Sequence, residues 1–111
     1  KLSGASLQKF DYGKIIEQLG DKDDFEENVY PTILPGYDRT ARAGRRAVIY
    51  YNNTPELFGK HLDKILTYVK NKSDEHKIIF LKSWNEWGEG NYMEPDLKYG
   101  YSYLNELKKR L

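Results

Sequence analysis

Apolar side chains recur at helical spacing in three parts of the chain. Between Asp11 and Gly20 they lie three or four positions apart, which predicts a short helix that Asp11 caps and Gly20 ends. A second helix is predicted to begin at Thr54-Pro55-Glu56, because threonine caps a helix, proline is tolerated at the first position and an acid favours the helix dipole. Its apolar face consists of Phe58, Leu62, Ile65, Leu66 and Val69. A closing helix is predicted within residues 99–111.

Three other segments have the composition of strands. The apolar run at residues 78–81 is too short for a helix core and predicts a strand buried on both faces in a parallel sheet. Residues 28–36 are rich in β-formers but hold two prolines, so we expect a strand of about five residues ended by Pro35-Gly36. Residues 47–51 fit either a short strand or a structured loop, and residues 1–10, which show no sustained period, are expected to lead in from a preceding element.

The predicted elements alternate in a way that indicates an α/β fold, with a parallel sheet and helices outside it. The 111 residues and 39% hydrophobic content suffice for one modest core, so we expect a single domain over residues 1–111. In isolation the chain is expected to form an open parallel sheet of two to four strands with flanking helices, because so few strands do not close a barrel. Since it begins with Lys1 rather than Met, we expect it to be an excised piece of a longer protein.

Composition narrows the possible functions. The 18 basic and 17 acidic side chains give a net charge of +1, so we expect no nucleic-acid partner. The absence of cysteine excludes disulfides and thiolate metal sites and suits a cytoplasmic protein. No apolar run approaches the roughly 18 residues of a membrane helix, so we expect no transmembrane segment in this chain.

Candidate chemistry is concentrated in Ser83-Trp84-Asn85-Glu86-Trp87-Gly88-Glu89-Gly90-Asn91-Tyr92-Met93-Glu94-Pro95, directly after a predicted strand. In α/β sheets, ligand sites lie at the carboxyl ends of the strands. Gly88 permits a sharp turn, so Glu86 and Glu89 can face one pocket. Two carboxyl groups beside indole rings indicate glycoside chemistry, in which one acid donates a proton, the other acts as base or nucleophile, and aromatic faces pack against sugar rings.

Other polar residues are candidate substrate contacts. Asn85 is suited to bind a sugar hydroxyl or orient a glutamate, and Glu94 to hold a hydroxyl, whereas Asp96 is expected to be structural. Residues 37–46 also follow a predicted strand and contain Asp38 and four arginines. This segment predicts an anion or sugar subsite or, alternatively, a solvated and mobile loop.

Neither histidine is expected to have a functional role. His61 lies off the apolar stripe of the second predicted helix and is expected to be exposed, and His76 is expected to be a solvated loop residue. Gly59 is expected to weaken the same helix by roughly 1 kcal/mol relative to alanine.

The motif at residues 83–96, followed by Tyr99-Gly100-Tyr101-Ser102-Tyr103-Leu104, closely resembles the C-terminal signature of the WbsX-like glycosyltransferase family, which is associated with bacterial lipopolysaccharide and O-antigen synthesis. It is also similar to the related glycoside hydrolase family 99 endo-α-mannosidases, which share an Asn-Glu-Trp-x-Glu-Gly core on a (β/α)8 barrel. Upstream, Tyr37-Asp38-Arg39-Thr40-Ala41-Arg42 resembles the Trp-Asp-Asn-Thr-x-Arg loop of the family, with departures at Tyr37 and Arg39.

This resemblance implies that the chain is the C-terminal portion of a (β/α)8 TIM-type barrel. Carried over by motif position, Glu86 is the base toward the 2-hydroxyl of the sugar and Glu89 is the acid and then base. No metal or organic cofactor is implied. The residues expected to contact substrate are Asp38, Arg42, Trp84, Asn85, Trp87, Tyr92 and Glu94.

The expected function is that of a carbohydrate-active enzyme fragment acting on an oligosaccharide or lipid-linked glycan, with a WbsX-like glycosyltransferase favoured. An endo-α-mannosidase-type hydrolase and a non-catalytic carbohydrate-binding or structural domain remain alternatives. The isolated chain is expected to have little or no activity, and its exposed sheet edge is a possible route to self-association.

Overall fold

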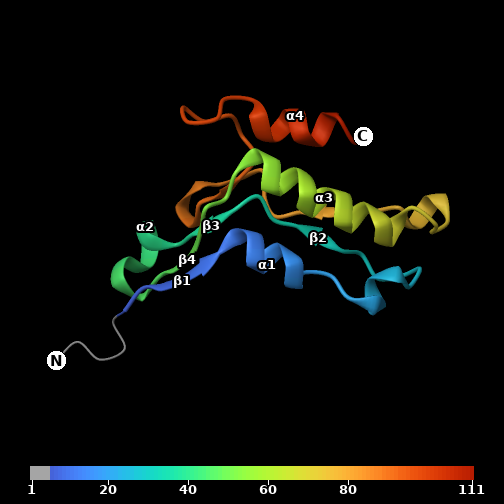
Figure 1. Cartoon of the computed structure of the whole chain (residues 1–111), viewed down its shortest axis with the longest axis horizontal. Helices are drawn as coiled ribbons and strands as arrows, with labels where there is room; N and C mark the ends of the chain where they lie inside the picture. Colours follow the sequence, from blue (N-terminus) through green and yellow to red (C-terminus); the bar gives the residue numbers. More distant parts are fainter. Residues whose placement is uncertain (1–5) are drawn as a thin grey trace.

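Helices and short strands alternate along the chain, so the fold is mixed α/β (Figure 1). The structure, a computed structural model, describes residues 6–111. In chain order the elements are β1 (Gln8–Asp11), α1 (Tyr12–Gln18), η1 (Lys22–Phe25), β2 (Thr32–Ile33), β3 (Tyr37–Asp38), α2 (Thr40–Ala43), η2 (Gly44–Arg46), β4 (Val48–Tyr51), α3 (Pro55–Val69), η3 (Asp74–His76), β5 (Phe80–Leu81), β6 (Asn85–Glu86), η4 (Trp87–Glu89), β7 (Asn91–Tyr92) and α4 (Ser102–Lys108).

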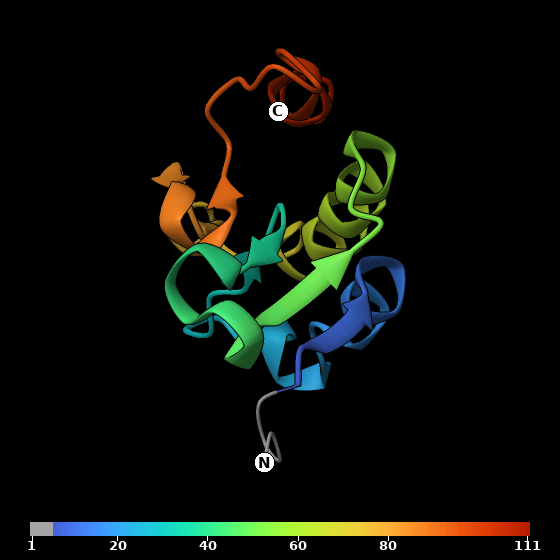
Figure 2. The same cartoon turned by 90° about the vertical axis from the view of Figure 1, so that its left-hand side faces the viewer.

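The strands form three small sheets (Figure 2). In the first sheet β4 lies in the middle, parallel to β1 and antiparallel to β3. In the second sheet β2 and β5 pair in parallel, and the third sheet is the antiparallel hairpin of β6 and β7. The α/β class is therefore confirmed, but the prediction of one open parallel sheet is wrong. The reason is that the chain reverses direction between β3 and β4, through α2 and η2, and between β6 and β7, through η4, which produces the antiparallel pairs.

The caps predicted for the first two helices are confirmed. The Asp11 carboxylate accepts a hydrogen bond from the Gly13 N–H at 2.8 Å at the start of α1. The Thr54 hydroxyl accepts one from the Leu57 N–H at 3.2 Å at the start of α3. The closing helix is present but short, because α4 starts after Tyr101, whose side chain provides no cap.

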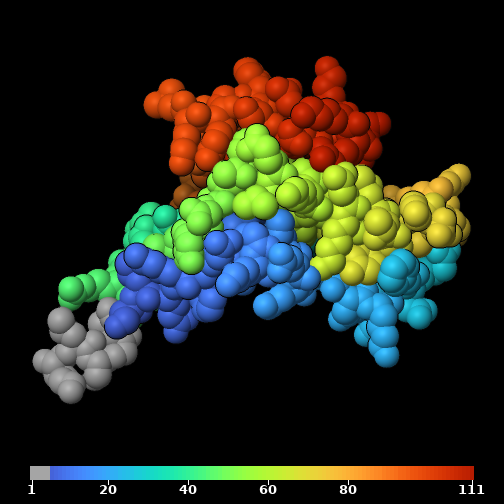
Figure 3. Space-filling view, viewed as in Figure 1, coloured from blue at the N-terminus to red at the C-terminus, as the bar shows by residue number. Residues whose placement is uncertain are grey.

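The core lies against α3. Phe58, Leu62 and Ile65 of this helix form one buried cluster with Ile33 of β2 and with Met93, which follows β7. In Figure 3, α3 lies between the N-terminal part of the chain and α4. The core thus joins the second sheet and the motif segment to the same helix, which fixes their relative positions.

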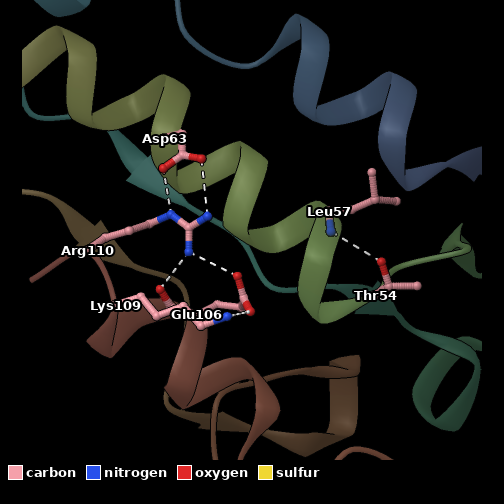
Figure 4. Close-up of polar contacts among 6 residues, drawn as sticks. All are labelled: Thr54, Leu57, Asp63, Glu106, Lys109 and Arg110. Atoms are coloured by element: carbon pink, nitrogen blue, oxygen red, sulfur yellow. Dashed lines mark hydrogen bonds and ion pairs between the residues drawn. The ribbon is translucent and has the colours of Figure 1, made fainter.

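An ion-pair cluster holds α4 against α3 (Figure 4). The Arg110 guanidinium donates to both carboxylate oxygens of Asp63, at 2.6 and 3.1 Å, and to Glu106 Oε1 at 3.0 Å. Lys109 also pairs with Glu106, at 2.8 Å. A Cβ at Gly59 would lie 2.5 Å from Glu106 Oε1, so Gly59 provides room for this cluster. The glycine expected only to weaken α3 therefore permits the close approach of α4.

Two strand predictions need correction. Residues 28–36 contribute only the two residues of β2, because the flanking prolines Pro31 and Pro35 have no N–H to donate. Residues 78–81 contribute β5, but Ile78 and Phe80 are 41% and 57% exposed. The predicted burial on both faces is wrong because only one face, that of Ile79 and Leu81, packs against the core.

Strand β1 is not predicted by the sequence pattern. Its four residues, Gln-Lys-Phe-Asp, include a single apolar side chain and show no alternation that would indicate a strand. Pairing with β4 supplies the stabilisation, with Phe10 opposite Tyr50, and β4 itself confirms the strand alternative for residues 47–51. Residues 1–5 of the predicted lead-in lie outside the described residues.

Both histidines are less exposed than predicted. His61 is 1% exposed, and its Nε2 accepts a hydrogen bond from the Leu34 N–H at 3.1 Å. The segment after β2 covers this flank of α3, a tertiary contact that helical periodicity does not reveal. Burial, with a smaller contribution from the nearby Lys64 charge, lowers the pKa of His61 to about 4. His76 is half-buried, and its Nδ1 lies 2.5 Å from the Tyr30 hydroxyl.

The depressed pKa of His61 predicts a loss of stability in mild acid. The unfolded chain binds the proton near the ordinary histidine pKa of about 6.5, whereas the folded chain binds it near about 4. The contribution of His61 is therefore complete above about pH 6.5 and falls as the pH decreases toward 4, by at most about 1.4 kcal/mol per pH unit. An NMR titration of the His61 ring should give a midpoint near 4, and a midpoint near 6.5 would contradict the buried, neutral imidazole.

Candidate active site

The segments that follow three strands meet at one end of the fold. The segment after β2 leads into β3 and α2, the segment after β4 leads through Asn53 into α3, and the segment after β5 forms the β6–β7 hairpin. The hairpin turn η4 packs against both β3 and α2, as Figure 2 shows. Ligand sites in α/β proteins lie at the carboxyl ends of parallel strands, so this end carries the candidate site.

The motif at residues 83–95 forms a tight hairpin. Glu86 of β6 lies opposite Asn91 of β7, and the η4 turn between them ends at Gly90. The Ser83 hydroxyl donates to the Asn91 carbonyl at 2.6 Å and accepts from the Glu86 N–H at 3.2 Å. Ser83 therefore fixes the base of the hairpin from which the first candidate glutamate projects.

Two glycines let this hairpin approach the β3–α2 segment. Gly90 has a left-handed backbone with φ +58°, and a Cβ there would lie 2.8 Å from the Asp38 backbone nitrogen. A Cβ at Gly88 would lie 2.8 Å from Arg42 Nε. The left-handed turn is therefore at Gly90 rather than at Gly88, where the sequence predicts it. Gly88 instead provides space for the Arg42 side chain.

Arg42 joins the two candidate catalytic glutamates. Its Nη2 lies 2.9 Å from Glu86 Oε1, and its Nη1 lies 3.2 Å from Glu89 Oε2. The arginine comes from α2 and both acids come from the hairpin, so one guanidinium connects segments that follow different strands. The Glu89 side chain is 19% exposed and the Glu86 side chain 36%. Both carboxylates are therefore positioned by contacts and remain open to a ligand.

A second network orders the aromatic side chains of the hairpin. The Trp87 indole stacks on Tyr92 with ring centroids 3.6 Å apart, and its Nε1–H donates to Glu94 Oε1 at 2.6 Å. The Tyr92 hydroxyl donates to Asp96 Oδ2 at 2.9 Å. Burial, reinforced by this hydrogen bond and by the charge of Asp96, raises the pKa of Tyr92 to about 12. The phenol therefore stays protonated near neutral pH and keeps its hydrogen bond.

The remaining residues predicted to contact substrate are Asp38, Trp84 and Asn85, and they belong to neither of these two networks. Asp38 Oδ1 accepts hydrogen bonds from the Thr40 N–H at 2.9 Å and from its hydroxyl at 2.6 Å, which stabilises the start of α2. Trp84 and Asn85 are exposed and are not among the residues that line the cavity at this end. Asp96, expected to be structural, holds the turn before α4 by accepting from the Tyr99 N–H at 2.6 Å.

A cavity of about 390 Å³ lies between the hairpin, the β2–β3 segment and the start of α3. Asp38 and Tyr92, two predicted substrate contacts, line it. The lining residues that sequence reasoning missed are Tyr37, Tyr50, Tyr51, Asn53, Lys98, Tyr99 and Tyr103. Their only sequence signal is position near strands, because Tyr37, Tyr50 and Tyr51 lie on β3 and β4 and Asn53 comes shortly after β4. Phenol and amide groups around an aromatic lining suit a polar ligand with apolar faces.

Glu86 and Glu89 are not part of the cavity lining, but Gly90 of the same hairpin and Asp38 of the segment that carries Arg42 both are. Cavity and cluster are thus adjacent parts of one face. Across residues 6–111, no three histidine, aspartate or glutamate side chains are arranged to hold a metal ion. The same range contains no helix with the length and apolar character needed to cross a membrane.

Comparison with known proteins connects this geometry to a family. The model of the family described as glycosyltransferase WbsX matches residues 2–107. Two proteins from Xanthomonas campestris pv. campestris, each named uncharacterized protein WxcX, are also similar to the chain. The protein of strain B100 is 27% identical over 103 residues, which covers 92% of this chain and 15% of the relative. That of the second strain is 31% identical over 84 residues, covering 75% of this chain and 12% of the relative.

The chain therefore spans only 12% to 15% of the length of these relatives. No solved structure matches it.

The close approach at Gly90 yields a stability prediction with a matched control. Gly100 has a similar backbone, with φ +55°, but a Cβ there would meet nothing within 4 Å. Gly100→Ala should therefore cost only the left-handed strain of about 1–2 kcal/mol. Gly90→Ala should destabilise the protein more, because the methyl group also displaces Asp38. Urea denaturation of both variants measures the difference, and equal losses would show that the hairpin does not depend on this contact.

Proposed function

This chain belongs to the WbsX glycosyltransferase family, and from that premise we propose that it is the C-terminal part of a carbohydrate-active enzyme that acts on glycosidic bonds. The observation that supports this most directly is the convergence of Glu86 and Glu89 on Arg42, beside a tyrosine-rich cavity. Breaking a glycosidic bond typically uses two carboxyl groups, one as acid and one as base or nucleophile, and aromatic side chains beside them can pack against the sugar.

The two glutamates take different roles in this proposal. Glu86 as carboxylate removes the proton of the sugar 2-hydroxyl, and the resulting oxygen attacks the anomeric carbon while Glu89 protonates the departing glycosidic oxygen. In the second half, Glu89, now ionised, removes the proton of the acceptor hydroxyl as it attacks the anomeric carbon. The C1–O2 bond then breaks, and Glu86 returns its proton to the 2-oxygen. Each glutamate ends in its starting protonation state, so the cycle is balanced.

Arg42 is proposed to be a positioning residue. Its contacts hold the two carboxyl groups of one short hairpin at fixed orientation. Because the Arg42 side chain is half exposed, a sugar hydroxyl or the bond oxygen can replace one of these contacts when substrate binds.

The element order supports a place in a (β/α)8 barrel. Three strand–helix units follow one another along the chain: β1 with α1, β2 with α3 after the intervening β3–β4 segment, and β5 with α4. In addition, β2 and β5 pair in parallel. We infer that these are the last units of the barrel. In that setting the carboxyl ends of the strands, where the glutamates lie, form the catalytic face. The proposed substrate is an oligosaccharide or lipid-linked glycan of lipopolysaccharide or O-antigen synthesis.

The paired carboxylates serve a hydrolase as well as a transferase, because the two differ in whether water or a sugar hydroxyl is the acceptor. Calorimetric titration of the full-length protein with a nucleotide sugar and with an α-linked mannobiose separates them. Binding of the nucleotide sugar supports a transferase that uses such a donor. Binding of the disaccharide alone supports the hydrolase.

Glu86→Gln and Glu89→Gln should each remove nearly all turnover of an α-mannoside-like substrate by the full-length protein, because an amide neither accepts nor donates the transferred proton. Glu17→Gln on the exposed face of α1 is the matched control and should leave turnover unchanged. Initial rates measured by chromatography of the released or elongated glycan provide the test. Near-normal turnover in either motif variant would refute the catalytic assignment.

A further inference from the structure

A second hollow lies beside the hairpin and the segment that leads from it to α4. This open groove has a volume of about 620 Å³ and is lined by Trp87, Pro95, Leu97 and Tyr101. It shares Tyr92, Asp96 and Lys98 with the tyrosine-rich cavity. The two hollows are therefore neighbours that share a common wall.

The Trp87 indole is fixed although 46% of the residue is exposed. Tyr92 covers one ring face, and Glu94 accepts the only polar hydrogen of the indole. What remains accessible is hydrocarbon ring surface held in a single orientation. Such a preorganised aromatic surface suits contact with the C–H face of a pyranose, because little side-chain entropy is lost on binding.

The wall between the hollows is also rigid. Asp96 accepts hydrogen bonds from the Tyr92 hydroxyl at 2.9 Å and the Tyr99 N–H at 2.6 Å, and its carbonyl accepts from the Gly100 N–H at 2.9 Å. These contacts occupy both carboxylate oxygens of Asp96. Lys98 lies over the Tyr99 ring at 5.1 Å and has no ion-pair partner among the described side chains, so its ammonium is available to ligand hydroxyls from either hollow.

We propose that the groove is a separate sugar-binding position, occupied by the part of a glycan chain that continues from the cavity across the Tyr92–Asp96 wall. The inference rests on the proposed function and extends it, because it requires a substrate of several sugar units rather than a single terminal sugar. Trp87 and Tyr101 contact the distal unit in the groove, and Tyr51 contacts the unit in the cavity. The shared wall of the two hollows is the reason for assigning one glycan chain to both.

Variants of two exposed tyrosines can distinguish binding in the groove from binding in the cavity. Tyr101, 67% exposed, lines only the groove, and Tyr51, 43% exposed, lines only the cavity. Neither side chain is part of the core, so both alanine variants should fold. Phe25→Ala is the control for loss of an exposed aromatic ring, because Phe25 is 57% exposed and lies on η1, away from both hollows.

The experiment measures affinity of the full-length protein for immobilised α-linked oligosaccharides of mannose, rhamnose, glucose, galactose and fucose, from one to five units long. We expect affinity to rise with length. Tyr101→Ala should weaken binding of the longer chains about tenfold, which corresponds to the loss of one stacking contact. The affinity for the shortest oligosaccharides that bind should stay unchanged. Tyr51→Ala should weaken binding at every length, and Phe25→Ala should change nothing.

The outcomes separate the two proposals. Binding that does not depend on length, or a Tyr101→Ala variant equal to the parent protein on the longest chain bound, overturns the groove assignment and leaves the carbohydrate function standing. Binding of none of these glycans at any length overturns the carbohydrate function and the groove assignment with it.

Discussion

The contact of Arg42 with Glu86 and Glu89 is the interaction on which the site depends. The guanidinium contacts both carboxyl groups, which lie three residues apart on one turn, and fixes their orientation relative to each other. Half-exposed ion pairs of this kind add at most about 1 kcal/mol to stability, so the contact matters for geometry rather than for the free energy of unfolding. It joins the hairpin after β5 to the helix after β3, and it brings the acids to the edge of the cavity.

That geometry is anchored by the core beneath it. Ile33, at the end of β2, and Met93, after the hairpin, are buried in one cluster with the apolar face of α3. Both segments that meet at Arg42 therefore continue from residues packed on the same helix. α4 is in turn held to α3 by Arg110, and it carries Tyr103 to the cavity. Packing of one amphipathic helix thus determines the positions of the acids and of the tyrosines.

The sequence predicts those features of the structure that depend on contacts between residues close together in the chain. The Asp11 and Thr54 caps are local hydrogen bonds, and the stripe on α3 is a direct consequence of helical periodicity. Strand β1 and the burial of His61 depend on tertiary pairing, with β4 and with the Leu34 N–H, and no local pattern encodes them. The motif glutamates can be found from composition and position. Except for Tyr92, the cavity tyrosines cannot, because they come from separate segments that only the fold brings together.

A crystal structure of the full-length Glu86→Gln protein with a bound α-linked disaccharide tests the central claim most directly. The variant should hold intact substrate. The account predicts that the side chain at position 86 contacts the 2-hydroxyl of the sugar, that Glu89 contacts the glycosidic oxygen, and that the next sugar unit enters the tyrosine-lined cavity. A disaccharide bound on another face, with Arg42 still in contact with Glu89 and no sugar near either motif residue, would contradict it.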